Sequence, residues 1–520
     1  KSYRLERMQV DVSNPWGFSF DRWEQPFLSD ASPGENWWAL PFAAKMPYGI
    51  EQPKVEQFVP KRSRPSSGGE FVSSRHFPDA NQGDFMTCNT IGFLGISFGT
   101  KRDDGAGFVG QANGDLLSST DGNFRPVDLE FAPDGSLYFL DWHNPLIGHM
   151  QHNARDPNRD HEHGRIYRVT YPGRPLVKPA KVAGATVAEL LANLQEPEYR
   201  TRYRTRRELR ARPASEVLPA VKAWVAQLDP QDPAYEHHLC EALWATWAQN
   251  QPDGELIRRL LKAKPFEARA AAADVVRHAF RQLPDHVALL DQAVRDEHPR
   301  VRLTAVVAAT WLDNADGAKL ALEAFRQPVD RWLAPVLHYA LTYTLKDDVA
   351  ALQAAGALDL ADNLAAAEYL AGKSKIGQPS AETGPKPVRK LTAAEEKVFQ
   401  LGREVYFRDA HCATCHQANG KGMAGVYPPL EKSAWIDDDE RFIKIALKGL
   451  WGPIEVNGVQ YDPSKGVPPM TGFGGLLNDN EMAAVLSYVR LSFGNNGTMI
   501  SSEQVRKVRE ATKDRMNFYT

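Results

Sequence analysis

The sequence predicts a multidomain protein in which three regions of different fold class follow one another along 520 residues. Residues 1–175 combine dense aromatic residues with frequent turn signals, which is typical of β structure. Residues 176–372 are rich in Ala, Leu and Arg at helical spacing. Residues 391–495 carry a C-x-x-C-H motif between two amphipathic helical stretches. A chain of this length is expected to hold about two to four domains.

The β region contains three related units. The third unit, residues 126–141, has the pattern of a hairpin: an alternating strand, a Pro-Asp-Gly turn and a second alternating strand. The first unit covers residues 14–30, and the second covers residues 71–98. Units spaced in this way suggest the blades of a propeller. Propellers need about four to eight blades, so we expect a partial β-propeller, completed upstream of Lys1 or by another polypeptide.

The helical region shows an internal repeat. Residues 266–276 and 300–309 align, each with Arg near the start and Ala or Val at helical spacing afterwards. A period of about 30 to 40 residues with paired helices predicts an α-solenoid that is HEAT-like. The arginines of residues 202–210 could bind an anionic partner, but we interpret them as a solvated helix face. Residues 373–390 are predicted to be a linker. In the tail, residues 496–520, we expect a charged helix that packs on the preceding domain or on a partner.

The most informative motif is Cys412-Ala413-Thr414-Cys415-His416, the attachment signal of a c-type haem. Two thiols add to the vinyl groups of the haem, and the adjacent histidine supplies one axial nitrogen to the iron. A zinc or disulfide site is the alternative for such a pattern. The glycine-rich stretch that follows, ending in residues 427–430, can approach a flat macrocycle closely, which makes Tyr427 and Pro429 candidate pocket residues.

A second candidate ligand of the iron lies further on. Prolines before Met470 stiffen an extended loop, and such a loop can hold a thioether against the iron face opposite His416. His/Met ligation raises the reduction potential. Met423 is the alternative, and we interpret it as a packing residue. Residues 391–494 as a whole resemble a class I cytochrome c domain, which is all-α. The resemblance implies one covalent haem c, with Cys412 and Cys415 as thioether links and His416 and Met470 as axial ligands.

Composition narrows the functional classes. The net charge of −3 gives no indication of nucleic-acid binding, and no apolar stretch is long enough to span a bilayer. Of the four cysteines, Cys88 and Cys240 are expected to be free, buried thiols. Haem attachment implies export to the periplasm. No signal peptide is visible, and we expect that Lys1 is not the natural start. Any membrane association would use a partner or a missing segment.

A second resemblance extends over nearly the whole chain. It is carried by the order of the three regions and by segments that include residues 14–17, 61–65, 71–77, 123–128, 141–149 and 156–169, which resemble those of a family of membrane-bound dehydrogenases abundant in planctomycetes and related bacteria. In that family a propeller of the sorbosone/glucose dehydrogenase type precedes HEAT repeats and a C-terminal haem domain. Related soluble enzymes use pyrroloquinoline quinone and often Ca²⁺. The resemblance therefore implies these two cofactors for this chain. Ser13 stands where their cofactor loop has Arg, and this departure weakens the quinone assignment.

Candidate chemistry in the β region centres on histidines. Arg75, His76 and His149 are the candidate catalytic residues. Five of the fourteen histidines lie within residues 143–163, and among them His149, His152, His161 and His163 are candidate ligands of another metal. The alternative for this His-rich loop is a folded segment held by hydrogen bonds between its histidines and neighbouring carboxylates or backbone. Arg75 and His76 likewise fit a structural pair.

Two functional hypotheses follow. In the first, the chain is a periplasmic haem protein in which a quinone- or metal-dependent site in the propeller oxidises a carbohydrate-like alcohol or aldose, and the haem passes the electrons to an external acceptor. In the second, the chain is a non-catalytic electron-transfer or scaffold subunit of a larger redox complex. Both hypotheses require an electron-transfer partner protein or other subunits.

Overall fold

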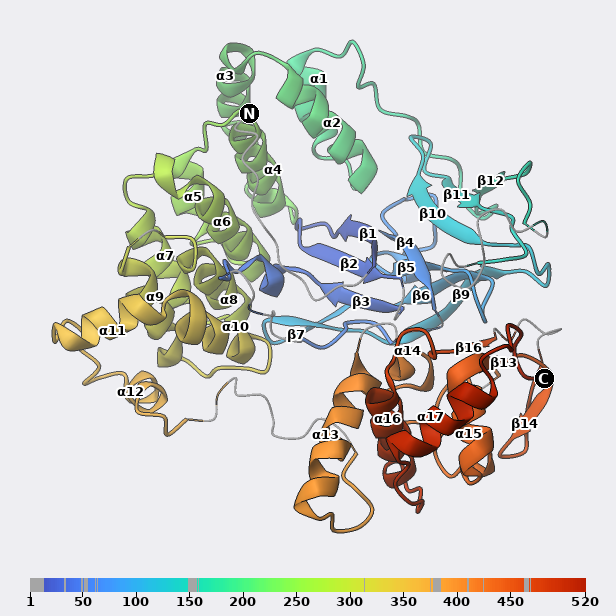
Figure 1. Cartoon of the computed structure of the whole chain (residues 1–520). Coiled ribbons are helices and arrows are strands. Elements are labelled where there is room, and N and C mark those ends of the chain that lie inside the picture. The colour runs from blue at the N-terminus through green and yellow to red at the C-terminus, as the bar shows by residue number, and fades with distance from the viewer. Residues whose placement is uncertain are drawn as a thin grey trace.

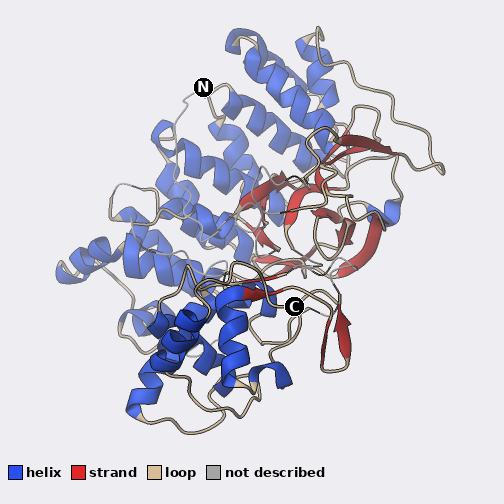
Figure 2. Cartoon of the chain, turned by 45° about the vertical axis from the view of Figure 1, so that its right-hand side comes forward, coloured by secondary structure: helices blue, strands red, loops and turns tan. Residues whose placement is uncertain are grey.

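The structure is a computed structural model. It describes residues 14–31, 34–47, 50, 55–60, 62, 64–147, 157, 159–312, 314–374, 376, 385–408, 411–423, 425–462, 467 and 469–520, without the side chain of Thr414. Sheets, a helical array and a C-terminal helical domain follow one another along the chain (Figure 1). Figure 2 shows the strands gathered between two groups of helices. Among the described residues, no helix combines the length and hydrophobicity that a membrane span requires.

Three antiparallel sheets make up most of the N-terminal region, and they do not close into a barrel. Strands β1, β4 and β10 are each the first strand of a sheet, and β4 lies between β1 and β10. The close approach of β4 to β10 depends on Gly68, because a Cβ there would lie 2.7 Å from the Asp128 Cα. The sheets comprise β1 Pro15–Phe20, β2 Pro26–Asp30 and β3 Glu35–Trp38; β4 Ser66–Phe71, β5 Phe85–Asn89, β6 Gly95–Gly99 and β9 Ala112–Ser118; and β10 Pro126–Phe131, β11 Leu137–Asp141 and β12 Arg165–Val169.

The hairpin predicted for residues 126–141 is confirmed as the antiparallel pair β10–β11, in which Leu129 lies opposite Phe139. Alternate residues of β11 are buried, so one face of this sheet packs inward. The second unit begins earlier than its sequence pattern suggested, because β4 starts at Ser66. A small hairpin, β7 Arg102–Asp104 with β8 Gly107–Val109, contacts the helical region, because the Trp332 side chain donates to Asp104 at 2.9 Å.

The helical region stacks its helices in two layers, and α2, α4, α6, α8 and α10 contact one another in that order. This layer faces the sheets. It shares one continuous apolar core with the first sheet, from Phe27 to Ala366. The helices are α1 Val187–Asn193, α2 Tyr199–Ala211, α3 Ala214–Val225, α4 Tyr235–Ala248, α5 Gly254–Leu260, α6 Phe266–Ala279, α7 His286–Val294, α8 Pro299–Ala309, α9 Asp316–Glu323, α10 Leu333–Tyr339, α11 Lys346–Ala354 and α12 Leu364–Leu370.

Buried arginines join the helices to the sheets. Arg300 is 1% exposed and donates to the carbonyls of Ala106 and Gly107 at 2.7 and 2.6 Å. The interpretation of the α2 arginines as a solvated face is wrong for two of them: Arg202 is buried against Glu241, and Arg206 pairs with Glu24 of the β region. Arg206 therefore helps to hold the helical region to the β region, whereas Arg202 joins α2 to α4 within the helical region.

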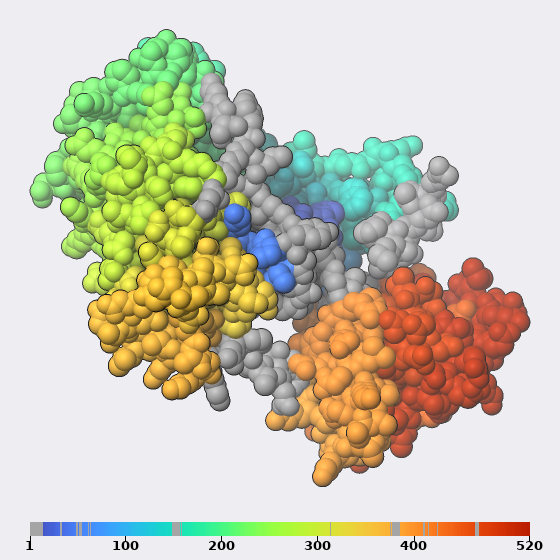
Figure 3. All heavy atoms as spheres, turned by 60° about the vertical axis from the view of Figure 1, so that its left-hand side comes forward, coloured from blue at the N-terminus to red at the C-terminus, as the bar shows by residue number. Residues whose placement is uncertain are grey.

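The C-terminal domain has an apolar core of its own and forms a separate lobe in Figure 3. Its main helix pair is α13 with α16, and Gly402 allows the crossing because a Cβ there would collide with the Ala484 carbonyl. The tail helix α17 packs back on this domain, with Val505 buried and Arg509 paired with Asp479. The elements are α13 Ala393–Phe407, α14 Cys412–His416, α15 Asp439–Lys448, α16 Asp479–Leu491 and α17 Ser502–Ala511, with strands β13 Gly449–Leu450, β14 Ile454–Val456, β15 Val459–Tyr461 and β16 Met470–Thr471.

Candidate functional site

The C-x-x-C-H motif forms the single-turn helix α14, which follows the long helix α13. Thr392 and Glu395 begin α13 with a capping box, in which each side chain bonds the backbone of the other residue. At α14, Cys412 and Cys415 are half-buried, and Cys412 packs against the domain core. Packing among apolar side chains, together with the neighbouring Cys415, raises the pKa of the Cys412 thiol to about 12. A neutral sulfur, as in a thioether, therefore suits this environment.

His416 is buried, and its ring is oriented by one backbone contact. Its Nδ1 lies 2.9 Å from the carbonyl oxygen of Pro428, so the neutral ring donates from Nδ1 and keeps a lone pair on Nε2. Burial also lowers the pKa of His416, which favours this neutral form. A metal-ligating histidine needs a neutral nitrogen and a hydrogen bond at its other nitrogen. The residues of α14 thus fit a haem iron.

The loop after α14 folds tightly around the histidine. Gly422 has φ +61°, and a Cβ there would collide with the Tyr427 carbonyl, so glycine is required. The Gly422 N–H donates to the His416 carbonyl at 3.0 Å. Tyr427 is buried, with the pKa of its hydroxyl raised by burial, and Pro429 is half-buried. Both candidate pocket residues thus lie on the loop that orients His416.

The two candidate methionines have different surroundings. Met470 is half-buried in β16, where it pairs with Leu450 of β13. Met423 lies in the loop after α14, and its N–H donates to the Tyr427 carbonyl at 2.8 Å. The Met423 backbone therefore takes part in the folding of the loop, which agrees with a packing role.

Arg75 and His76 have partners that join segments of the chain. Arg75 pairs with Glu198 at 2.7 Å, at the start of the helical region. His76 is buried: its Nδ1 lies 3.0 Å from the Pro175 carbonyl, and its Nε2 accepts the Tyr171 N–H at 2.9 Å. Both ring nitrogens are thus engaged by backbone, which leaves neither directed at a substrate.

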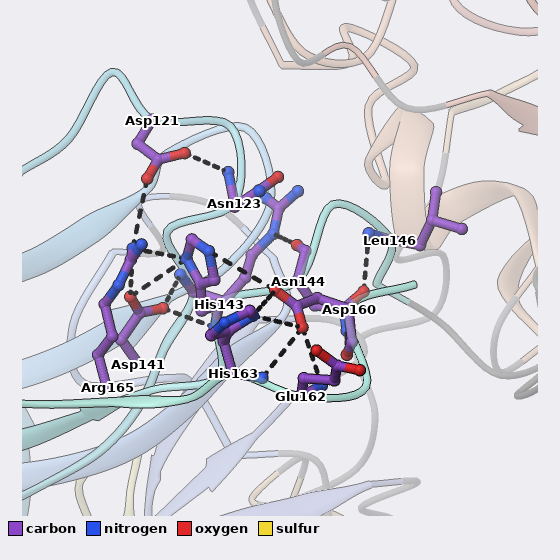
Figure 4. A network of polar contacts seen from close by, with 11 residues as sticks. Asp121, Asn123, Asp141, His143, Asn144, Leu146, Asp160, Glu162, His163 and Arg165 are labelled. Atoms are coloured by element: carbon purple, nitrogen blue, oxygen red, sulfur yellow. Dashed lines mark hydrogen bonds and ion pairs between the residues drawn. The ribbon is translucent and has the colours of Figure 1, made fainter. Parts of the chain in front are cut away.

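The described part of the His-rich loop is a hydrogen-bonded network (Figure 4). Asp160 accepts at 3.0 Å from the Nδ1 of His163, and Arg165 donates to the Nδ1 of His143 at 2.6 Å. His161 is exposed. Among the residues that the structure describes, no group of three or more His, Cys, Asp or Glu side chains is arranged to hold a metal. The candidates His149 and His152 lie outside the described residues.

Two residues near the haem motif were not found from the sequence. Tyr406, at the end of α13, is fully buried and donates to the Gln417 carbonyl at 2.7 Å. Arg64, from the segment before β4, contacts Cys415 across 351 positions of sequence. The helical pattern of α13 could have indicated that Tyr406 is buried, but no local signal indicates the position of Arg64.

Residues 399–492 match the family "Cytochrome c". Residues 41–173 match a domain of unknown function, DUF7133. The chain is 37% identical over 118 residues to cytochrome c-552 of Thermus thermophilus, an alignment that covers 83% of that protein and 21% of this chain. The chain belongs to the cytochrome c family. Its cytochrome c domain implies a covalent haem c.

A second, longer alignment matches the cytochrome c subunit of a dehydrogenase. The chain is 29% identical over 213 residues to a protein of Gluconobacter oxydans (strain 621H) named "Alcohol dehydrogenase (quinone), cytochrome c subunit". The alignment covers 35% of this chain and 42% of that subunit. The chain therefore spans less than half of the length of this relative.

Proposed function

We propose that this chain is an exported electron-transfer protein with a single haem attached through Cys412 and Cys415, and with His416 and Met470 as axial ligands. The contact between His416 Nδ1 and the Pro428 carbonyl carries the proposal, because it fixes the ring in the form that binds iron through Nε2. Haem attachment to such a motif takes place after export, which supports a periplasmic location.

A bound haem c supplies one-electron chemistry. In this proposal the protein fills both axial positions, so none is left for a substrate. His416 is held by the Pro428 carbonyl, and the tight turn at Gly422 closes the loop beside it. The half-buried Met470 supplies a thioether, a ligand that raises the reduction potential. The site therefore suits electron transfer rather than catalysis on a substrate.

We further propose that the electron donor is a dehydrogenase partner that oxidises a carbohydrate-like alcohol or aldose. The named cytochrome c subunit of a quinone-dependent alcohol dehydrogenase supports this role. Arg75 and His76 are engaged by residues of this chain, which favours an oxidation site on the partner protein. That protein would then hold any pyrroloquinoline quinone and Ca²⁺. The three sheets, with β1, β4 and β10 side by side, support a partial β-propeller, and the two-layer array supports a HEAT-like solenoid. Both would serve as docking modules.

The test is reduction of the ferric holoprotein, followed by its visible spectrum. We expect no reduction by sugars or alcohols alone, with or without pyrroloquinoline quinone and Ca²⁺, and rapid reduction when the catalytic subunit of a quinone alcohol dehydrogenase is added. Reduction of the haem by substrate and quinone without that subunit would instead assign the oxidation site to the β region of this chain. Failure of every donor, including dithionite, would contradict electron transfer itself.

The axial ligand is tested by Met470→Ala with Met423→Ala as the matched control. We expect the Met470 variant to keep its covalent haem but to lose the thioether, so its reduction potential falls. The Met423 variant should keep the potential of the parent protein. A fall in potential on changing Met423, with no effect at Met470, would assign the sixth ligand to Met423.

A further inference from the structure

Arg64 reaches from the β region to the haem-attachment cysteine. Its Nη2 donates to the Sγ of Cys415 at 2.9 Å. The guanidinium also lies over the ring of Tyr427, with its central carbon 5.0 Å from the ring centroid. Cys415 and Tyr427 both belong to the cytochrome c domain, on either side of His416. A single side chain from another region therefore contacts the haem site at two points.

The backbone that carries Arg64 is held by neighbouring sheets. Ser66 lies two residues after Arg64 and makes two hydrogen bonds to the end of the first sheet. Its N–H donates to the Ala31 carbonyl at 3.2 Å, and its hydroxyl donates to the Asp30 carbonyl at 3.3 Å. The carbonyl of Pro65 accepts the Thr90 N–H at 3.4 Å. Arg64 thus extends from an anchored segment at the start of β4, next to the end of β2. Its position is set by the β region rather than by the cytochrome c domain.

We propose that Arg64 belongs to the haem site: it holds the Cys415 edge of the haem against the β region and raises the reduction potential. The proposal rests on the proposed function, since it requires a haem at Cys415. A guanidinium stays charged at every accessible pH. Oxidised iron carries one more positive charge than reduced iron, so a nearby fixed cation disfavours the oxidised state. Hydrogen bonds to groups bonded to the haem are a further means of tuning its potential.

The contact with Cys415 is compatible with haem attachment. A thioether sulfur retains a lone pair that accepts weak hydrogen bonds, as the sulfur of methionine does. The stacking on Tyr427 does not involve the sulfur, and cations over aromatic faces are attracted to them. Arg64 can therefore keep both partners when Cys415 carries the haem. The half-buried position of Cys415 limits screening by salt.

The chain offers a matched control two residues away. Arg62 pairs with Asp115 at 3.2 Å and lies over the Phe93 ring, both within the β region, and its side chain is 52% exposed. The experiment compares Arg64→Gln, Arg64→Lys and Arg62→Gln in the haem-loaded full chain. The reduction potential is measured by spectroelectrochemical titration, and hydrogen exchange is followed in a peptide that contains α14.

We expect Arg64→Gln to shift the reduction equilibrium toward the oxidised form by about tenfold, equal to about 59 mV for one electron. Exchange of the α14 peptide should become faster, because the β region no longer holds this edge. Arg64→Lys should shift the reduction potential much less than Arg64→Gln does, because it keeps the charge. Arg62→Gln should match the parent protein in both the reduction potential and the hydrogen exchange.

Normal haem content with an unchanged potential in Arg64→Gln would overturn this inference and leave electron transfer intact. An equal shift in Arg62→Gln would also overturn it, because general electrostatics would then explain the effect. If the haemochrome spectrum of the denatured parent protein shows no covalent haem, the proposed function fails as well. Failure of the Arg64 inference alone is therefore distinguishable from failure of the proposed function.

Discussion

Replacing Tyr406 by Phe isolates one hydrogen bond behind the haem motif. The Tyr406 hydroxyl donates to the carbonyl of Gln417, the residue that follows His416 and has φ 65°. The ring itself packs against Tyr488 and Phe493, with centroids 5.2 and 5.3 Å away. Phe at this position keeps the ring contacts and removes only the donor. The variant thus tests whether α13 holds the turn that orients His416.

The Gln417 carbonyl does not lose every donor in this variant, because the Gly420 N–H also reaches it at 3.1 Å. We therefore expect the cost of one net hydrogen bond, about 1 kcal/mol in the free energy of unfolding. For a domain of this size, that corresponds to a fall in Tm of about 4–8 °C. Thermal unfolding of the ferric holoprotein, followed by circular dichroism in the haem absorption band, measures the change.

Tyr488→Phe is the control. Tyr488 is as deeply buried, and its hydroxyl faces the Ser492 side chain without a hydrogen bond of normal geometry in the described part of the chain. Removing it should change Tm by less than Tyr406→Phe does. Equal falls in Tm for the two substitutions would refute the reasoning. The fall would then come from removing a buried hydroxyl, whether or not that hydroxyl has a hydrogen-bond partner.

Two further predictions concern the helical array and the haem loop. Burial lowers the pKa of His298 to about 4, and its neutral Nδ1 accepts the Arg300 N–H at the start of α8. An unfolded histidine has a pKa near 6.5. The free energy of unfolding should therefore fall as the pH drops from about 6.5 to about 4, because the unfolded state binds a proton that the folded state does not. Urea unfolding of His298→Asn over the same pH range should show a smaller fall than that of the parent protein. Gly422→Ala should lower Tm more than Gly425→Ala: both have positive φ, but only at Gly422 does a Cβ meet the Tyr427 carbonyl. Similar losses at both glycines would contradict the packing argument.

Local chemistry made the cytochrome c domain predictable from sequence. The haem motif, the helix that precedes it and the glycine-rich loop are contiguous, and their geometry follows from residue types at short spacing. The hairpin at residues 126–141 was predictable for the same reason, because its turn and alternating strands lie within one short segment.

Contacts between distant segments were not predictable. Periodicity identified α2 as a helix with many arginines, but it could not distinguish a face toward water from a face toward another region, and Arg202 proved to be buried. The contact of Arg64 with Cys415 depends on how the cytochrome c domain docks on the β region. The described part of the His-rich loop forms a hydrogen-bonded network, and such networks use the same residue types as metal sites, so the sequence alone could not distinguish the two.

The central claim is that Cys412 and Cys415 carry one haem whose iron His416 binds. Intact-mass measurement of the exported, denatured protein, followed by peptide mapping, tests it most directly. We predict one added haem mass that stays on the peptide containing both cysteines, and that is lost when both are changed to Ser. An unmodified mass, or a disulfide between the two cysteines, would contradict the account.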